Sequence, residues 1–474
     1  MTAKKTKIRC RLAPSPTGMF TLGNARTALF NWLFARHAGG IFVLRIENTD
    51  ESRSDDRYEK EIIEGLAWLN INWDEGPDIG GPYGPYRQSE RTDIYEKYLK
   101  RLLEENKAYY CYCTKEELET ERQAQLAQGL APKYSGKCRA LTVAPGGVEP
   151  QVIRFKTPET KVTFKDLIRG HIQFDMGLTG DIVIAKNIIS PLYNFAVVVD
   201  DFEMNITHVI RGEDHIANTP KQILFQKALD MPTPHYGHLP LILNADRSKL
   251  SKRYAETSLL AYRDQGYLRE ALVNFMALLG WHPKDDREIF TLEELAKEFE
   301  LERVQKAGAV FDERKLAWLN AQYIKNTPTS SLIKLLKPFE NVKVEEDILL
   351  KVIELEKGRV ETLKGMLRDA EFFFNLEEYD SKILMWKNGT QAKTKENLVL
   401  AHKTIEDVSG DDFTEANLQK ILMAVAEKIG RGDLLWPLRV ALSGKTASPG
   451  PFEIMAILGK TESLKRIDRA IHKL

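Results

Sequence analysis

The sequence predicts a multidomain α/β protein, in which a parallel-sheet domain carries an insertion and precedes an all-helical C-terminal region. Residues 7–46 indicate a strand, a glycine-bearing turn, a helix and a second strand, which together make one βαβ unit. Similar patterning returns after residue 181, and beyond about residue 327 the apolar residues recur only at helical spacing. Because a βαβ unit joins parallel strands, we expect the first part to be a Rossmann-type sheet.

The elements of the first unit follow from simple local signals. A strand is predicted over residues 7–12, and the prolines and glycine of residues 14–18 force a tight turn after it. From Asn24 the apolar residues recur at helical spacing, and the glycine pair at residues 39–40 stops that helix. A second strand is predicted over residues 41–46.

Later elements are predicted in the same way. Amphipathic spacing indicates helices at residues 58–68, 94–105 and 219–229, and strands at residues 206–215 and 239–243. The continuous apolar run at residues 191–201 indicates a buried segment, either strand or helix. In the tail we expect only helices, at residues 331–337, 346–356, 359–374, 394–408, 415–428, 436–443 and 453–466.

Changes in pattern divide the chain into five predicted segments. The two halves of the sheet domain are predicted at residues 1–105 and 186–245. Residues 106–185, between them, have β character and form the predicted insertion. Residues 246–328 begin with a lysine-rich loop and continue as helices, and residues 329–474 form the helical tail.

Length and composition exclude several classes of protein. At 474 residues the chain is long enough for two to four domains. Its 68 Lys and Arg residues balance 68 Asp and Glu residues, so no overall charge indicates a polyanionic partner, although a local basic patch could still bind nucleic acid. Four cysteines are too few for a disulfide framework. With no signal-peptide pattern and no run of 18 apolar residues, we expect a cytoplasmic protein that does not bind membranes.

The turn of the first βαβ unit is the first candidate site. The sequence RLAPSPTG at residues 11–18 runs into TLGNART at residues 21–27, and the N-terminus of the following helix is suited to bind an anion. An ordinary structural crossover is the alternative interpretation. Charged and polar residues near the strand ends favour a ligand site instead: Arg11, Ser15, Arg26, Glu47 and Asp50.

The second candidate site is the loop DRSKLSKR at residues 246–253. Four of its eight residues are cationic, and the loop follows a strand and has no helical period. A solvated turn is the plain alternative. Because the loop ends the same α/β unit that begins with the anion site, we prefer a cationic clamp on phosphates, made by Lys249 and Lys252.

The third candidate site lies in the insertion. Cys111 and Cys113 are one residue apart, and Cys138 follows 25 positions later, which suits a small zinc site that closes a loop. A structural zinc ion needs four ligands, and Tyr134 is the candidate for the fourth, although phenolate is an uncommon ligand. The alternative is three reduced thiols packed as small apolar residues.

Several motifs together resemble the bacterial glutamyl-tRNA synthetases, a family of class I aminoacyl-tRNA synthetases, and the resemblance covers essentially the whole chain. The motifs are RLAPSPTG at 11–18, RIENTD at 45–50, GPYRQSER at 84–91, YNFAVVVDD at 193–201, VIRGEDH at 209–215, KLSKR at 249–253, PLRVALSG at 437–444 and FEIMAILG at 452–459.

The resemblance implies a two-step reaction. L-Glutamate and ATP, carried as its Mg²⁺ complex, give glutamyl adenylate, and the acyl group then passes to the 3′ terminal adenosine of tRNA(Glu). The implied glutamate-binding residues are Arg11, Ser15, Glu47, Tyr193 and Arg211. The implied ATP-binding residues are Gly18, Thr21, Gly23, Asn24, Lys249 and Lys252, of which Thr21, Gly23, Lys249 and Lys252 are also expected to act in catalysis.

Positively charged residues suit these roles chemically. A dicarboxylate needs two cationic partners, and Arg11 and Arg211 can each make bidentate contacts; which arginine binds which carboxylate is left open. Glu47 is expected to bind the substrate ammonium group. The resemblance also implies that the insertion binds the tRNA acceptor stem, that residues 246–328 contact the stem, and that the tail binds the anticodon of a monomeric enzyme.

The chain departs from the family at one important position. The family's signature begins with a histidine that contacts the ATP phosphates, and Thr21 stands in its place. A working but slower activation step is therefore expected, or alternatively a low-activity, tRNA-binding paralogue. In the tail, Arg359 matches a family position that helps to reject the glutamine anticodon, so we expect charging restricted to tRNA(Glu) over an enzyme that also charges tRNA(Gln).

Two other relatives are weaker alternatives. An enzyme that glutamylates a base of tRNA(Asp) would lack the helical tail, and a glutaminyl enzyme would be expected to have a β-barrel there. The helical tail predicted for this chain argues against both.

Overall fold

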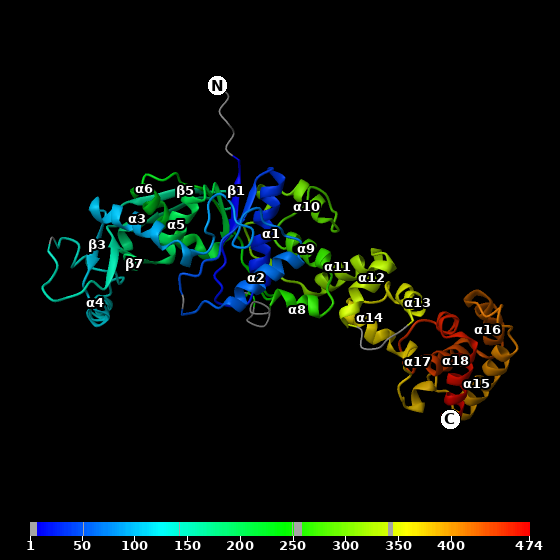
Figure 1. The fold of residues 1–474 in the computed structure, drawn as a ribbon. Helices are drawn as coiled ribbons and strands as arrows, with labels where there is room; N and C mark the ends of the chain where they lie inside the picture. The colour runs from blue at the N-terminus through cyan, green and yellow to red at the C-terminus, as the bar shows by residue number, and fades with distance from the viewer. Residues whose placement is uncertain (1–6, 51, 142, 249, 251–257, 340–344) are drawn as a thin grey trace, which may run out of the picture. The chain divides into compact units, whose positions relative to one another are not determined.

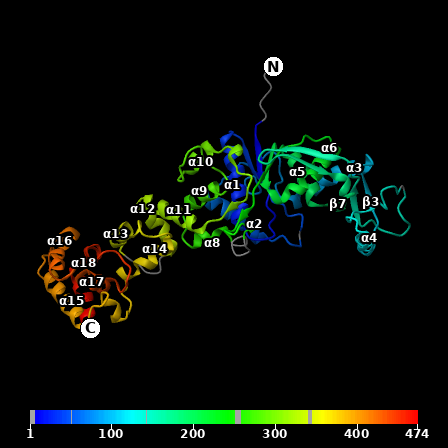
Figure 2. The same ribbon diagram turned by 180° about the vertical axis from the view of Figure 1, so that it is seen from behind.

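The computed structural model describes residues 7–50, 52–141, 143–248, 250, 258–339 and 345–474. They form two compact units, drawn from two sides in Figures 1 and 2. Unit 1 is Met1–Arg263 with Arg269–Glu313, and unit 2 is Asp264–Leu268 with Arg314–Leu474. The strands all lie in unit 1, and the described part of unit 2 is helical.

A parallel sheet forms the centre of unit 1. Strand β1 (Arg9–Leu12) pairs in parallel with β2 (Ile41–Leu44), and β9 (His208–Gly212) pairs in parallel with β10 (His235–Leu239). The amide of Thr207, just before β9, donates to a carbonyl of β1 at 3.0 Å, so β9 lies beside β1. The order β2-β1-β9-β10 confirms the predicted Rossmann-type sheet and brings the carboxyl ends of four strands to one edge.

The insertion contributes a hairpin to this sheet. Strand β5 (Lys161–Asp166) pairs antiparallel with β6 (Gly170–Asp175) through all six of its residues. The end of β5 also pairs in parallel with β10, where Asp166 lies opposite Tyr236. Asp166 is therefore brought to the edge of the central sheet, next to the carboxyl ends of β9 and β10.

The remaining insertion strands form a separate antiparallel sheet in the order β3-β4-β7-β8. These strands are β3 (Ala108–Cys111), β4 (Val152–Phe155), β7 (Ile182–Asn187) and β8 (Ser190–Pro191). Figures 1 and 2 both show β3, β7 and α4 at the end of unit 1 away from α8, α9 and α10. The sequence pattern placed the return of the parallel domain at residue 181, but β7 pairs antiparallel with β4, because an apolar strand does not specify its partner.

Helices cover the sheet of unit 1. The run at residues 191–201, left open as strand or helix, is helical from Tyr193 onwards. The predicted strand at residues 239–243 is instead the end of β10 followed by the short β11 (Ile242–Leu243), which pairs with β12 (Ala309–Val310). The helices are α1 (Leu22–His37), α2 (Asp56–Trp68), α3 (Thr92–Glu104), α4 (Lys115–Ala127), α5 (Tyr193–Glu203), α6 (Thr219–Ala228), α8 (Leu259–Asp264), α9 (Arg269–Leu278) and α10 (Leu292–Glu298).

A side-chain cap determines where helix α1 begins, and a close backbone contact determines how the chain leaves it. The Thr21 hydroxyl accepts from the amide of Asn24 at 3.4 Å, which satisfies one of the amide groups that a helix N-terminus leaves without a partner. At the other end, a Cβ on Gly40 would lie 2.5 Å from the Ile8 carbonyl, so the chain needs glycine there to enter β2. Thr21 thus fixes the start of α1, and Gly40 allows the passage into β2.

Unit 2 confirms the predicted helical tail. A core of apolar side chains from α15, α16, α17 and α18 holds its C-terminal helices together. Within the described part of the chain, no helix is long and apolar enough to cross a membrane. The helices are α11 (Glu313–Asn326), α12 (Thr329–Leu336), α13 (Glu346–Glu356), α14 (Leu363–Ala370), α15 (Gln391–Glu406), α16 (Glu415–Ile429), α17 (Arg431–Ser443) and α18 (Pro451–Lys473).

The fully buried carboxylate of Asp200, on α5, is hydrogen-bonded to side chains of the segment that leads into α3 and of α3 itself. Asp200 accepts from the Nε of Arg91 at 2.7 Å, from the side-chain NH₂ of Gln88 at 2.7 Å and from the Tyr95 hydroxyl at 2.9 Å. The Nε of Arg45 lies 3.8 Å away. Burying this carboxylate is favourable only because each of its oxygens has partners.

We expect Asp200→Ala to destabilise unit 1 by about 3–5 kcal/mol, because it leaves the buried Arg91 guanidinium without its carboxylate. Thermal unfolding of the purified chain measures the effect. Asp285→Ala is the matched control: Asp285 also lies 2.7 Å from an arginine, Arg287, but its side chain is 50% exposed, so the unfolding midpoint should not change. Equal shifts in both variants would contradict the assigned role of Asp200.

Candidate active site

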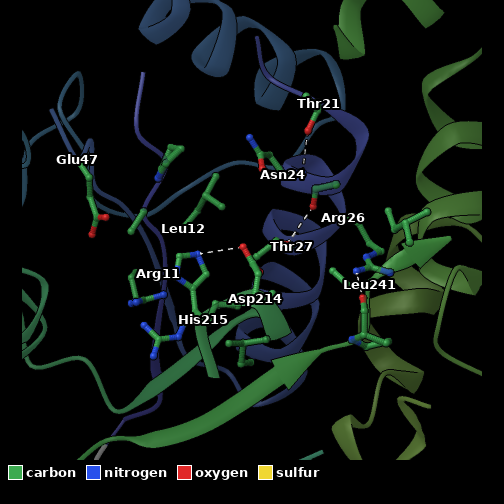
Figure 3. A pocket seen from close by; sticks show the side chains of 18 of the residues that line it. Arg11, Leu12, Thr21, Asn24, Arg26, Thr27, Glu47, Asp214, His215 and Leu241 are labelled. Atoms are coloured by element: carbon green, nitrogen blue, oxygen red, sulfur yellow. Dashed lines mark hydrogen bonds and ion pairs between the residues drawn. The ribbon is translucent and has the colours of Figure 1, made fainter. Parts of the chain in front are cut away.

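A cavity of about 410 Å³ opens at the carboxyl ends of the parallel strands in unit 1. Its walls come from the end of β1, the start of α1, the end of β9 and the segment after β10. Figure 3 shows Arg11 and Glu47 on one side of this cavity and Thr21 and Asn24, at the start of α1, on another. Seven predicted site residues line it: Arg11, Thr21, Gly23, Asn24, Glu47, Tyr193 and Arg211.

Other predicted residues are placed differently. Ser15 is exposed and Gly18 is half-buried, and neither is among the residues that line the cavity. Lys249 and Lys252 lie outside the described residues. Leu250, between them in sequence, does line the cavity, so the described part of the cationic loop reaches the same site.

The cavity also contains residues that sequence reasoning did not assign to the site. Asp214 and His215 follow Arg211 on the segment after β9, and Leu241 lies just before β11. Arg26, which the sequence already placed among the polar residues near the strand ends, lines the same cavity. The signal for the first two was available, because they belong to the same VIRGEDH motif as Arg211. Leu241 gave no signal, since an apolar residue after a strand looks like any core position.

The first cation of the site, Arg11, is paired with a buried carboxylate. Its Nε lies 3.1 Å from Asp201, and Arg45 lies 2.8 Å from the same carboxylate. Burial alone would raise the pKa of Asp201, but the charges of Arg11 and Arg45 outweigh it and lower that pKa. Arg11 therefore reaches the cavity with much of its charge already compensated.

Glu47 supplies the negative charge of the cavity. It accepts from Arg45 at 3.1 Å, and both side chains are buried. Burial raises the pKa of Glu47, and the charges of Arg45 and Arg11 only partly oppose this. A cationic group bound at Glu47 would stabilise the carboxylate further, so the position suits an ammonium ligand.

The second cation, Arg211, is buried without an anionic partner. Its Nη2 donates to the Thr219 hydroxyl at 2.8 Å and to the side-chain carbonyl of Gln222 at 2.9 Å. Its Nε donates to His238 Nε2 at 3.3 Å. Among the described residues no carboxylate lies within ion-pairing distance of Arg211, and its Nη1 has no hydrogen-bond partner. A buried guanidinium in this state is suited to receive an anion from the cavity.

Tyr193 lies in the same wall as a neutral phenol. Burial raises its pKa, and the charge of Glu47 adds to this. Its hydroxyl lies 3.3 Å from His215 Nδ1. Besides Arg26 and Asp214, the cavity thus presents the guanidinium groups of Arg11 and Arg211, the Glu47 carboxylate and the Tyr193 hydroxyl. This set fits a small molecule with both carboxylate and ammonium groups.

Thr21 and Gly23 form the opposite wall at the start of α1. A Cβ on Gly23 would meet nothing closer than the Thr21 hydroxyl at 3.8 Å, so this backbone is open to a ligand. The backbone of Thr21 pairs with Ser258, the first described residue after the cationic loop, and the Leu259 amide donates to the Phe20 carbonyl at 2.7 Å. The loop therefore returns to the fold beside the helix N-terminus.

A second, separate cluster lies in the insertion. The sulfur atoms of Cys111, Cys113 and Cys138 are buried and lie within 4.8 Å of one another. Cys113 and Cys138 are 3.6 Å apart, and the Tyr134 hydroxyl lies 3.5 Å from Cys111 and 3.7 Å from Cys113. Two thiolates bound to one tetrahedral zinc ion lie about 3.8 Å apart, so the four side chains fit such an ion.

The anticodon candidate, Arg359, lies in unit 2. Its side chain is 47% exposed and its Nε lies 3.5 Å from Glu356 at the end of α13. The predicted helix at residues 359–374 begins later, because Thr362 caps α14 and Arg359 is in the preceding turn. An arginine on such a turn is accessible to a large ligand.

Unit 1, which contains the cavity, lies largely within a segment that matches a known protein family. A family model described as the catalytic domain of tRNA synthetases class I (E and Q) matches residues 7–318. The chain belongs to the class I tRNA synthetases. A second model, described as an anticodon binding domain, matches residues 331–471 of this synthetase.

Full-length relatives agree with this family. A glutamate–tRNA ligase of Thermodesulfovibrio yellowstonii is 46% identical over 98% of this chain and 99% of its own length. One of Desulforudis audaxviator is 45% identical over 98% and 96%. The crystal structure of a glutamate tRNA ligase from Elizabethkingia meningosepticum in complex with its amino acid matches with a TM-score of 0.88 and 35% identity, covering 98% of this chain and 99% of that one. The synthetase therefore has the fold class that its sequence predicted.

Proposed function

We propose that the protein is a glutamate–tRNA ligase, which activates L-glutamate with ATP and transfers it to tRNA(Glu). The observation that carries this proposal is the pair of guanidinium groups in the cavity, with the uncompensated Arg211 facing Arg11 and Glu47. Glutamate has two carboxylates and one ammonium group, and Arg11, Arg211 and Glu47 offer two cations and one anion for them. The glutamate–tRNA ligase relatives, similar over the full length, support the same substrate.

The proposed glutamate pocket uses Arg11, Arg211 and Tyr193 for the carboxylates and Glu47 for the ammonium group. Arg211 contributes most to selection, because its charge has no partner until an acidic ligand binds. Ser15 stays a prediction of the resemblance. The chemistry is positioning and charge stabilisation, so no general base is needed.

The proposed ATP site lies at the start of α1. Gly18, Gly23 and Asn24 let the backbone approach the phosphates, and Lys249 and Lys252 neutralise charge on the departing pyrophosphate. A glutamate carboxylate oxygen bonds to the α-phosphorus as the bond to pyrophosphate breaks, with ATP carried as its Mg²⁺ complex. A hydroxyl of the terminal tRNA adenosine then bonds to the activated carbonyl carbon, and AMP leaves.

The remaining assignments are proposals of the same kind. Residues 106–185 would bind the acceptor stem, residues 246–328 would contact the stem, and residues 329–474 would bind the anticodon. The sheet-domain boundaries at residues 105 and 186, the monomeric state and the cytoplasmic location stay predictions.

Pyrophosphate exchange and aminoacylation test the proposed reaction together. With ATP, and with tRNA both present and absent, we expect exchange that depends on glutamate and not on glutamine. Charging of tRNA(Glu) should exceed charging of tRNA(Gln) by at least about fivefold, because one misread base typically costs about 1–3 kcal/mol, and Arg359→Ala should lower that ratio. A chain that binds tRNA but shows neither activity would be the silent paralogue instead.

Thr21 sets the expected speed of activation. We expect Thr21→His to accelerate glutamate-dependent exchange, by up to about 10²-fold, because one donor to the reacting phosphates is typically worth that much. The same change removes the hydroxyl cap of α1, so a stability loss of about 1 kcal/mol should accompany it. Thr21→Ser keeps both hydroxyl and cap and should behave as wild type. An unchanged rate in Thr21→His would remove Thr21 from the activation step.

We also propose that the insertion binds one zinc ion through Cys111, Cys113, Cys138 and Tyr134. With no cation present, burial raises the pKa of the Cys113 thiol to about 12, and a dication bound there would reverse this and hold the thiolate form. The ion would close the loop between β3 and β4, which carries α4.

We expect the purified chain to contain about one zinc ion, measured by elemental analysis, since structural zinc sites are tight at neutral pH. Cys138→Ala should lose the metal. Cys10→Ala is the matched control, because Cys10 is equally buried but lies in β1, outside the cluster. Wild-type protein with no zinc and intact insertion structure would establish three reduced thiols.

A further inference from the structure

Behind the substrate-facing arginine lies a buried chain of polar side chains. Arg211 Nε lies 3.3 Å from His238 Nε2, and His238 Nδ1 lies 2.6 Å from an Asp166 carboxylate oxygen. All three residues are at most 5% exposed. The Thr219 hydroxyl, 3.1 Å from the same Nε2, can donate to it, and arginine only donates. His238 Nε2 therefore accepts, and the proton of the neutral imidazole is on Nδ1, facing Asp166.

The carboxylate that sets this tautomer is itself held in place. Asp166 is the last residue of β5, and its Oδ1 accepts from the amides of Ile168 at 2.9 Å and Arg169 at 2.8 Å in the hairpin turn. The His238 amide also lies 3.3 Å from that oxygen. Burial would raise the pKa of Asp166, but the hydrogen bonds from His238 and the two turn amides outweigh it, so the pKa is lowered and the group is ionised at neutral pH.

His238 stays neutral in this environment. Burial, more than any other cause, lowers its pKa, the charge of Arg211 adds to this, and the hydrogen bond to Asp166 opposes it without reversing the direction. The net result is a pKa below the usual value, so the imidazole is uncharged at pH 7. The titratable or charged groups that face it from the surrounding elements are Asp166 and Arg169 of the β5–β6 hairpin, Arg211 of β9, His215 after β9, and Tyr236 of β10.

This arrangement keeps the charge of Arg211 available. A carboxylate in direct contact would hold the guanidinium equally well, but it would also neutralise it, as Asp201 does for Arg11. His238 separates the carboxylate of Asp166 from Arg211 by the width of an imidazole ring. The guanidinium is therefore oriented by three neutral acceptors, on His238, Thr219 and Gln222, while its Nη1 stays without a partner.

We propose that Asp166 and His238 are positioning residues for substrate selection: Asp166 fixes the His238 tautomer, and His238 orients Arg211 towards a glutamate carboxylate. The inference rests on the proposed glutamate pocket. It also gives the insertion a part in amino-acid binding, since Asp166 comes from β5.

The alternative is that the Asp166–His238 bond only fastens the hairpin to β10. Asp166→Asn separates the two roles, because Asn keeps an oxygen for the turn amides and replaces the other oxygen with an NH₂ group. That NH₂ must donate to His238 Nδ1, which moves the ring proton to Nε2 and places two donors, Nε2–H and Arg211 Nε–H, against each other. The acceptor left beside Nε2–H is the Thr219 hydroxyl, which Arg211 Nη2 already uses, so the orientation of Arg211 is disturbed in either case.

We expect Asp166→Asn to raise KM for glutamate by about 10- to 100-fold in pyrophosphate exchange, the usual range for loss of an orienting partner. KM for ATP and the thermal midpoint should change little. A fall in thermal midpoint with an unchanged KM for glutamate, or equal increases in both KM values, would overturn the proposal. Loss of glutamate-dependent exchange in the wild type would instead count against the proposed function.

A second variant keeps the test informative. His238→Gln retains a side-chain carbonyl that can accept from Arg211 whatever residue 166 is. In the His238→Gln background, Asp166→Asn should therefore have little further effect on KM for glutamate, because its path through the imidazole is gone. The same increase in both backgrounds would show that Asp166 acts independently of His238 and would overturn the proposal.

The pH dependence of KM for glutamate in Asp166→Asn distinguishes a changed His238 tautomer from a protonated His238 ring. Asp166 raises the pKa of His238, so its replacement by Asn lowers that pKa further and leaves the imidazole neutral over a wider pH range. The increase in KM for glutamate in Asp166→Asn should thus persist unchanged from about pH 6.5 to 8.5, a range above the usual histidine pKa. Recovery of the wild-type KM at the alkaline end would indicate protonation of His238 and contradict the tautomer argument.

Discussion

The site depends on a buried ionic network behind the strand ends. Arg45, which is fully buried, lies 2.8 Å from Asp201 and 3.1 Å from Glu47, and Arg11 shares the Asp201 carboxylate. These residues come from β1, from the segment after β2 and from α5. Because a buried charge without a partner is very costly, the three elements can close only in the arrangement that pairs these groups. That arrangement places Arg11 and Glu47 in the wall of the cavity.

The two arginines of the cavity illustrate two ways to hold a buried cation. Arg11 has a carboxylate partner, so it contributes shape and hydrogen bonds more than net charge. Arg211 has only neutral acceptors, so its positive charge remains available to attract an anion that enters the cavity. In the proposed function, a pocket with both kinds would select against a neutral amide such as glutamine, since Arg211 would then remain buried without an anion.

Much of the site could be predicted because its residues belong to short motifs next to strand ends. Arg11, Thr21, Glu47 and Arg211 were expected at one sheet edge, and the parallel topology brings them there. The roles of Asp166 and His238 were not foreseeable, because each lies in an unremarked segment and their contact spans 72 residues. The state of α5 was ambiguous for a related reason: a helix buried on most sides shows the same continuous apolar run as a buried strand.

The sequence by itself determined the βαβ entry, the helical tail and the chemical types at the site, because each depends on local periodicity, turn residues or motif spacing. Only the tertiary structure decided which cation is compensated, which tautomer His238 adopts and which strands the insertion contributes to the central sheet. Those features depend on pairing between distant segments, where one residue of register changes every partner. Burial then determines their energies, since the same charges would interact only weakly in water.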